Sequence, residues 1–491
     1  PTPNIDRIAN EGILFTHFYN AARCCPTRAS LLTGLYPHQA GIGDMTEGRV
    51  RLDGTHLPAY QGYLNEHSMT LAEVLKEADY KTYISGKWHV GDAPEHWPAK
   101  RGFDRSFSLI SGASNYFNLE PYISEEQEIV LVENEKEIKV GDDFYMTDNI
   151  GEHAVKYLED HGDDTPFFLY LAFTAPHWPL QAPLEELEKF RGTYLKGWEV
   201  LRKQRYRGLI QKGVIEEGTQ LSDPYFERPF LTPDWDTLSE DDRTAFDHRM
   251  AAYAATITRM DTQVGRVLEF LEQDGQLDNT LIMFLSDNGA TKAYMYLVTQ
   301  WIADRSGPIG SARSFEAQGA MWANASNTPY RMFKSNTMEG GIITPLLVRY
   351  PRMIRAGTIN REPSHLVDIF PTILELTGAE YPGNFKSQTL TPLQGLSLVP
   401  LLTGESEHLP RRPLFWEHHG NAAVRLGKYK LVRQHHGPWQ LYDLQEDPVE
   451  MNDLAGMMPD KVDRLEALYE AWATEVSVEP WDSLKLTHTY P

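Results

Sequence analysis

Residues 24–34 read Cys-Cys-Pro-Thr-Arg-Ala-Ser-Leu-Leu-Thr-Gly, and they carry the most specific pattern in the chain. Pro26 suits the first turn of a helix and Gly34 suits its end, so a short helix is expected between them. Cys24 would then lie at the helix N-terminus, where the helix dipole favours negative charge, and Arg28 adds a fixed cation nearby. A buried structural cysteine is the other interpretation of such a residue.

On either side of this segment, buried-strand patterns alternate with helical patterns. The expected strands are 81–85, 167–173, 281–285 and 345–348, and the expected helices are 71–78, 250–272 and 367–377. Apolar strands that alternate with helices predict an α/β fold with a mostly parallel sheet covered by helices on both faces. In such a sheet, functional residues collect in the loops that follow the carboxyl ends of the strands.

The character of the sequence changes near residue 405. A polar, proline-bearing segment leads into short β-like pieces and a final helical pattern at 461–476. We therefore expect a large α/β domain at 1–405 and a small C-terminal α+β domain at 406–491 with an antiparallel sheet. Residues 184–243 are charged and irregular, and we expect a helical insertion there.

Composition excludes several classes of partner. The 491 residues include 46 Lys and Arg against 69 Asp and Glu, which gives a net charge of −23. A surface this acidic disfavours nucleic acid and anionic membranes as partners, and no apolar run approaches the ~20 residues of a membrane span. The only cysteines, Cys24 and Cys25, are adjacent, so a disulfide framework and a C-x-x-C metal site are not expected.

The segment at 24–34 resembles the signature of the type I sulfatases, C-x-P-S/T-R-x-x-x-L-L/T-G, of the alkaline phosphatase superfamily. Further segments resemble the same family in the same order, and the Trp322 segment resembles bacterial arylsulfatases. They are Thr2–Arg7, Gly12–Thr16, Gly86-Lys87-Trp88-His89, Ala175-Pro176-His177-Trp178-Pro179, Ser286-Asp287-Asn288-Gly289, Trp322–Arg331, and Lys334 with Glu339-Gly340-Gly341. The resemblance thus covers nearly the whole chain.

The resemblance implies that Cys24 is oxidised to formylglycine by a maturation enzyme. In the family, the hydrated aldehyde attacks sulfur, and its second hydroxyl then allows sulfate to be expelled. The implied function is hydrolysis of an aryl or carbohydrate sulfate ester. The implied fold is that of alkaline phosphatase.

Two sets of residues follow from the resemblance: the catalytic residues Cys24, Arg28, Lys87, His89, His177 and Lys334, and the metal ligands Asp287, Asn288 and Cys24. By resemblance, Arg28 and His89 orient the diol, while Lys87 binds the diol and a sulfate oxygen. His177 and Lys334 contact the sulfate and the leaving oxygen, and His177 is the better general acid because imidazole titrates near working pH. The ligands offer hard oxygens that suit Ca²⁺. Taken singly, each of these residues would be interpreted as an ordinary turn residue or a solvated surface side chain.

The sequence departs from the family at its start. The family has an earlier strand that ends in an Asp-Asp pair of metal ligands, and no such pair precedes Cys24; Asp44 and Asp53 follow the motif and do not fit. Without that earlier strand, the sheet is expected to have a gap in its hydrophobic core. An N-terminally incomplete chain is the explanation we favour; a short form that binds without turnover and a replacement segment are the alternatives.

Several further expectations can be tested structurally. Trp88, Trp178 and Trp322 are candidates for stacking on a substrate ring. The pairs His418-His419 and His435-His436 are not expected to bind metal, because adjacent strand residues point to opposite faces, but they suit a substrate-pocket rim. The alternative functions are a phosphonate monoester or phosphodiester hydrolase and a catalytically silent protein that binds sulfated glycans. A periplasmic or secreted location is expected from the resemblance alone.

Overall fold

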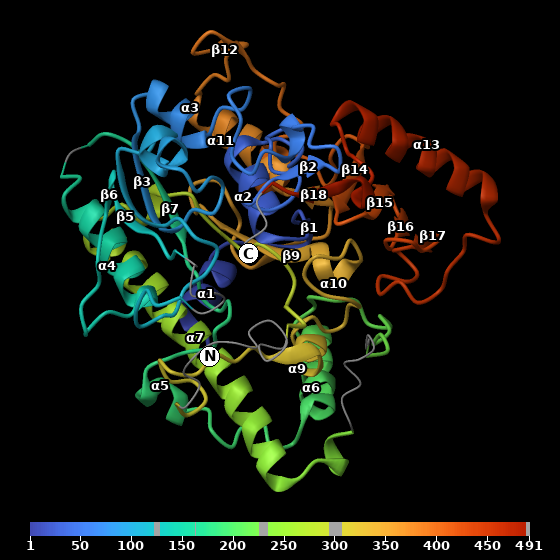
Figure 1. The fold of residues 1–491 in the computed structure, drawn as a ribbon, viewed down its shortest axis with the longest axis horizontal. Coiled ribbons are helices and arrows are strands. Elements are labelled where there is room, and N and C mark those ends of the chain that lie inside the picture. Colours follow the sequence, from blue (N-terminus) through green and yellow to red (C-terminus); the bar gives the residue numbers. More distant parts are fainter. Residues whose placement is uncertain (122–127, 163, 225–233, 294–306, 488–491) are drawn as a thin grey trace.

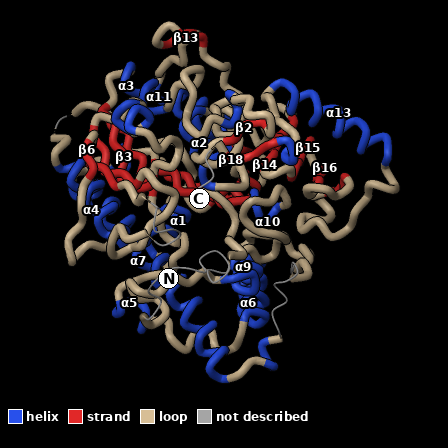
Figure 2. The backbone as a smooth tube through the Cα atoms, viewed as in Figure 1, coloured by secondary structure: helices blue, strands red, loops and turns tan. Residues whose placement is uncertain are grey.

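The structure is a computed structural model that describes residues 1–121, 128–162, 164–224, 234–293 and 307–487. Two five-stranded sheets form its centre, and Figure 2 shows their strands as a red band across the middle of the molecule. One sheet contains β1 (Ile13–Tyr19), β8 (Ile282–Leu285), β9 (Ile343–Arg349), β10 (Thr358–Asn360) and β11 (Ser364–His365). The other contains β3 (Lys81–Lys87), β4 (Arg105–Leu109), β5 (Leu131–Glu133), β6 (Lys136–Glu137) and β7 (Phe167–Ala172).

The expected α/β class is confirmed, and the sheets are mixed in direction. Strand β1 pairs in parallel with β10 and β11 but antiparallel with β9, which in turn pairs antiparallel with β8. Strand β3 pairs in parallel with β4 and β7, while β5 and β6 run antiparallel beyond β4. Apolar strand sequences report burial of both faces and not strand direction, which explains this difference from a mostly parallel sheet.

Helices cover both faces of the sheets (Figure 1). The helices of one face are α1 (Pro3–Asn10), α4 (Met146–Glu159) and α7 (Glu240–Gln273); those of the other are α2 (Cys24–Thr33), α3 (Leu71–Glu77) and α11 (Ile369–Thr377). Strand β7 shows why: Phe167, Leu169 and Leu171 pack with the first layer, and Phe168 and Tyr170 with the second. Its continuous apolar sequence therefore has a core on each side.

The two sheets present open edges to one cavity. Within the described residues, β7 pairs only with β3 and β8 only with β9. Both strands line a cavity of about 1280 Å³, together with apolar side chains from both helix layers. Every side chain of β8, and nearly every one of β7, is only partly buried. The polar end of this cavity is lined by six of the expected functional residues: Arg28, Lys87, His177, Asp287, Asn288 and Lys334.

Further helices and strands lie outside the two central sheets. They are α5 (Leu184–Glu188), α6 (Trp198–Gln211), α9 (Gly319–Ser326), α10 (Glu339–Ile342), α12 (Val399–Thr403) and the two-stranded pairs β2 (Arg49–Arg51) with β18 (Leu484–Leu486) and β12 (Asn384–Phe385) with β13 (Gln388–Thr389). Helices α5 and α6 lie within the expected insertion at 184–243, of which 225–233 falls outside the described residues. Helix α7 begins ten residues before the expected Met250, because Ser239 caps its N-terminus by accepting from Asp242.

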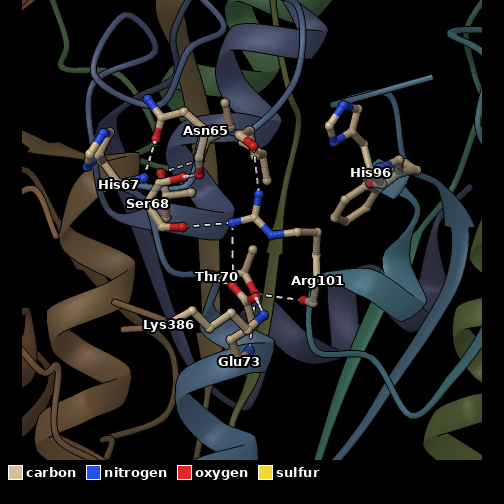
Figure 3. Close-up of polar contacts among 12 residues, drawn as sticks. Asn65, His67, Ser68, Thr70, Glu73, His96, Arg101 and Lys386 are labelled. Carbon is tan, nitrogen blue, oxygen red and sulfur yellow. Dashed lines mark hydrogen bonds and ion pairs between the residues drawn. The ribbon is translucent and has the colours of Figure 1, made fainter. Parts of the chain in front are cut away.

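A capping box fixes the start of α3. Thr70 accepts from the Glu73 backbone, and the Glu73 side chain accepts from the Thr70 backbone. Figure 3 shows how this helix end is fixed. Arg101 donates to the backbone oxygens of Leu64 and Ser68, at 2.8 and 2.7 Å, and Lys386 donates to Glu73 at 3.2 Å. The loops that follow α2 are thereby tied to the start of β4.

The C-terminal α+β region contains a four-stranded antiparallel sheet. Its strands are β14 (Pro413–His418), β15 (Asn421–Leu426), β16 (Tyr429–Arg433) and β17 (Trp439–Asp443), in that order, and α13 (Pro459–Glu475) packs on them. Figure 1 shows it in orange to red beside the two central sheets. A buried ion cluster joins the two parts: Lys430 contacts Glu339 at 2.7 Å and Glu450 at 2.8 Å.

Candidate active site

Helix α2 places Cys24 as its first residue, with Arg23 as the N-cap and Gly34 in the left-handed conformation as the C-cap. Both thiols are buried: Cys24 is 2% exposed and Cys25 is fully buried. The expected short helix between Pro26 and Gly34 is therefore present, extended by two residues at its start.

Local interactions favour negative charge on Cys24. A hydrogen bond from Cys25 lowers the pKa of the Cys24 thiol well below its usual value, and the charges of Lys87 and Lys334 act in the same direction. Burial raises the pKa of Cys25 instead. The chain thus distinguishes two adjacent thiols, one of which lies among cations.

Arg28 connects three parts of the site. The residue is 6% exposed, and its guanidinium donates to the Lys87 carbonyl oxygen at 2.9 Å, to the Tyr170 hydroxyl at 3.1 Å and to Asp287 Oδ2 at 3.1 Å. It therefore joins α2, the ends of β3 and β7, and the loop after β8. Tyr170 carries no motif of its own, and only its alternation on β7 indicates that it faces α2.

Lys87 and His89 lie at the carboxyl end of β3. Lys87 is 2% exposed, and burial lowers its pKa. Burial, together with the charge of Lys87, lowers the pKa of His89 to about 4, so the imidazole is neutral. His89 Nδ1 is buried without a hydrogen-bond partner, and the ring packs so closely on Gly112 that a Cβ there would lie 2.4 Å from it.

His177 and Lys334 are in contact near Cys24. Lys334 Nζ lies 3.2 Å from His177 Nε2, and His177 Nδ1 lies 2.7 Å from the Trp178 carbonyl oxygen. The carbonyl requires a proton on Nδ1, so Nε2 accepts from Lys334. Burial, followed by the charges of Lys334 and Lys87, lowers the pKa of His177 well below its usual value.

The loop after β8 offers oxygens to a cation. Asp287 and Asn288 follow the strand after Ser286, and Asn288 Oδ1 is buried without a hydrogen-bond partner, which suits an oxygen that binds a metal ion. A Cβ on Gly289 would lie 1.9 Å from the Gly340 carbonyl oxygen, so only glycine lets this loop approach the segment that bears Lys334. The donors present fit a hard divalent cation.

All eight expected residues thus gather at the carboxyl ends of β3, β7 and β8. The electrostatic neighbours of Cys24 include Lys87, Lys334 and His89, and Arg28 reaches Asp287. This end of the cavity concentrates positive charge in an acidic protein and can hold a small anion beside a nucleophile.

The histidine pairs are arranged differently from expectation. The rings of His418 and His419 stack with centroids 3.9 Å apart, and those of His435 and His436 are tilted by 35° with centroids 3.7 Å apart, so adjacent rings do not point to opposite faces. His419 and His436 have φ values of 54° and 62°, which end the regular strand alternation.

Two of the three expected ring-stacking tryptophans are core residues. Trp88 and Trp322 are fully buried; Trp88 donates to the His96 carbonyl oxygen, and Trp322 packs edge-on against Trp198. Their indoles complete apolar clusters, so their role as ring-stacking residues is wrong. Trp178 is half-buried and lies against His177, with ring centroids 4.8 Å apart.

Comparisons with known proteins show the family to which the chain belongs. The family model described as Sulfatase matches residues 1–379, and that of the N-sulphoglucosamine sulphohydrolase C-terminal region matches 330–468. The chain is 35% identical to an uncharacterized sulfatase of Schizosaccharomyces pombe, over 97% of this chain and 90% of that protein. It is 32% identical to the arylsulfatase of Klebsiella aerogenes, over 81% and 86%.

Among solved structures, Ps i-CgsB in complex with k-i-k-neocarrahexaose aligns with a TM-score of 0.68 at 27% identity, covering 98% of this chain and 88% of that one. Family model, relatives and architecture agree across almost the full length. The chain belongs to the sulfatase family, whose members hydrolyse sulfate esters.

Proposed function

We propose that Cys24, after oxidation to formylglycine, is the nucleophile with which this sulfatase attacks the sulfur of its substrate. The observation that carries this proposal is the place of Cys24: a buried thiol at a helix N-terminus, beside Lys87, Lys334 and His89. Hydration of the oxidised side chain supplies two hydroxyl groups on one carbon. One can attack the sulfur of the ester, and the other can assist the later release of sulfate.

The surrounding side chains have three further roles: they orient residue 24, neutralise the sulfate charge and supply a proton. Arg28 and His89 orient residue 24, and Arg28 is itself fixed by Asp287 and Tyr170. Lys87 and Lys334 neutralise the sulfate oxygens in a site sheltered from water, where charge interactions are strongest. The negative sulfate also favours a proton on His177, so Lys334 Nζ and His177 Nε2 hold the proton that the leaving alcohol needs.

Asp287 and Asn288 would hold a divalent cation, which we propose is Ca²⁺, and which supplies positive charge toward the sulfate. Two protein oxygens and residue 24 are few for this ion. We propose that further carboxylates reach the site from a strand that lies in the cavity between β7 and β8. Open edges on both strands, and apolar side chains around them, support a strand in that place.

The substrate we propose is a sulfated carbohydrate or an aryl sulfate, met in the periplasm or outside the cell. Relatives named as N-acetylglucosamine-6-O-sulfatase and N-acetylgalactosamine-6-sulfatase support the carbohydrate. No helix among the described residues is long and apolar enough to cross a membrane.

Peptide mapping by mass spectrometry of the protein from its natural source tests the proposal. We expect an aldehyde or its hydrate at position 24, and an Asp pair in a segment before Pro1. An unmodified thiol in an active enzyme would refute the nucleophile. Tight Ca²⁺ binding and turnover by a chain that starts at Pro1 would refute the additional strand, and faster cleavage of an aryl phosphodiester than of an aryl sulfate would refute the substrate class.

A further inference from the structure

A group of polar side chains flanks Cys24 on the side of the C-terminal sheet, and the proposed mechanism does not use it. Arg23 Nη1 lies 3.3 Å from His419 Nε2, in the turn between β14 and β15. The same nitrogen of His419 lies 2.8 Å from Asp44 Oδ1, and Arg49 donates to Asp44 Oδ2 at 2.6 Å. We call Arg23, Asp44, Arg49, His418 and His419 the Arg23 cluster.

The turn that carries the two histidines is tied to both catalytic loops. Asn421 Nδ2 donates to the Ser335 carbonyl oxygen at 3.4 Å, next to Lys334. The Ser335 backbone N–H donates to the Ala22 carbonyl oxygen at 2.8 Å, two residues before Cys24. The electrostatic neighbours of His418 include Cys24 and Arg23. The Arg23 cluster therefore adjoins the nucleophile.

The hydrogen bonds and charges of this cluster are incomplete. The Asp44 carboxylate is shared by Arg49 and His419. Arg23 is half-buried, forms no ion pair among the described residues, and has a buried Nε without a partner. His418 is fully buried, and neither of its ring nitrogens has a hydrogen-bond partner. Unmade hydrogen bonds are costly in a protein interior, so this arrangement points to a ligand.

The cluster suits an anion better than a metal ion. Asp44, His418 and His419 do offer three ligand atoms within 4.8 Å of one another. The two imidazole planes, however, are stacked with only 22° between them, so their in-plane lone pairs do not converge on one point. Arg23 and Arg49 also bring positive charge that would repel a cation.

We infer that Arg23 is a specificity-determining residue that binds a second anionic group on the sulfate ester beside Cys24, with His419 in contact with its guanidinium. The inference rests on the proposed function, because it assumes that the scissile sulfate lies at Cys24. A guanidinium binds sulfate or carboxylate through paired, charge-assisted hydrogen bonds. The substrate class is therefore a sulfate ester that carries a second sulfate or a carboxylate near the bond that is cleaved.

Calorimetric binding to the full chain with Cys24→Ala tests this inference without turnover. Three aryl esters serve as probes: 4-nitrophenyl sulfate, 2-carboxy-4-nitrophenyl sulfate and 4-nitrocatechol disulfate. When Arg23→Gln is combined with Cys24→Ala, the Kd of the two esters with a second anion should rise about ten- to a hundredfold. This is the change expected for the loss of a charge-assisted hydrogen bond. The Kd of 4-nitrophenyl sulfate should change by less than about threefold.

Matched variants separate recognition from folding. Arg433→Gln makes the same change at a half-buried arginine that lies over Trp439, and it should leave all three Kd values unchanged. Arg23→Lys, which keeps the charge but not the paired donors, should give an intermediate loss. A loss confined to the carboxylate or to the disulfate would identify the second anion.

Three results would overturn the inference: equal weakening of all three esters by Arg23→Gln, no weakening of any, or no measurable binding of either doubly charged ester. Hydrolysis by the unmodified enzyme is measured separately. Failure of the proposed nucleophile therefore shows in turnover, and failure of this inference shows in the difference between the Kd values.

Discussion

Lys334 Nζ lies 3.2 Å from His177 Nε2, although the two residues are 157 positions apart in the chain. The contact joins the loop after β7 to the segment before α10. Because Nδ1 of the imidazole donates to the Trp178 carbonyl oxygen, Nε2 is the nitrogen that Lys334 and a substrate oxygen share. The pair is thus suited to hold one proton beside the leaving group.

The Lys334–His177 pair should act as a unit. His177→Gln and Lys334→Met should each lower kcat for sulfate ester hydrolysis by about 10²–10⁴, as expected for loss of a general acid. The double variant should lose little more than either single one, because both changes remove the same proton. Steady-state kinetics on an ester with a poor leaving group would reveal the effect. Multiplicative losses would contradict a shared proton.

Adjacent thiols provide a test of the nucleophile. Cys24→Ala should reduce sulfate ester hydrolysis to the uncatalysed background, because no other side chain of the site can replace the nucleophile. Cys25→Ala removes a thiol that is equally buried and should leave measurable activity. Initial rates on an aryl sulfate distinguish the two. Retained activity in Cys24→Ala would refute the proposed chemistry.

Loss of a proposed metal ligand should weaken the binding of Ca²⁺ and leave the protein folded. Asp287→Asn should weaken the affinity for Ca²⁺ at least about tenfold, since it removes a charged ligand, and a chelator should abolish activity that added Ca²⁺ restores. Asp53→Asn makes the same change at an exposed carboxylate and serves as the control. Calorimetric titration with Ca²⁺ measures both. Equal affinities would exclude Asp287 as a ligand.

The buried ion cluster should couple the C-terminal sheet to the catalytic domain. Lys430→Met would leave Glu339 and Glu450 buried and unpaired, which should lower the free energy of unfolding by about 3–5 kcal/mol. Lys428→Met removes a partly exposed ion pair with Asp443 and should cost less than about 1 kcal/mol. Urea unfolding measures both changes. Similar values for the two variants would contradict a role for burial.

Acid should destabilise the fold through His365. Burial lowers the pKa of His365 to about 3, below its value in the unfolded chain, so the unfolded state binds more protons at intermediate pH. Its contribution to stability is therefore complete above about pH 6.5 and is lost as pH falls, at about 1.4 kcal/mol per pH unit. His365→Gln should reduce this slope in urea titrations at several pH values.

His408 provides the control for that slope. Glu362 raises the pKa of this exposed imidazole, so its contribution is present at low pH and is lost as pH rises. His408→Gln should therefore not reduce the acid-induced loss. An unchanged slope in His365→Gln would show that other groups cause the loss.

Local signals predicted much of the fold. Pro26 lies in the first turn of α2 and Gly34 caps its end, and Thr70 and Glu73 start α3 as a capping box, because these effects act within a few residues. The direction of the strands was harder to predict from the sequence. The apolar runs of β8 and β9 report burial on two faces, which an antiparallel pair within a covered sheet satisfies as well as a parallel one.

By itself, the sequence determined the kinds of functional side chain and the loops that carry them. Cys24, Arg28, Lys87 and the others stand next to helix or strand boundaries that the sequence specifies locally. Their placement around one end of the cavity follows from those boundaries, since strand ends meet at a common edge.

Only the tertiary structure decided which neighbours complete the site. Tyr170 bonds Arg28 because β7 faces α2, and Trp88 and Trp322 are excluded from the site because distant apolar side chains enclose them. His418 and His419 stack beside Arg23 because a positive φ ends the strand there and Asp44, far away in sequence, holds one ring. Such contacts join residues hundreds of positions apart, and no local propensity encodes them.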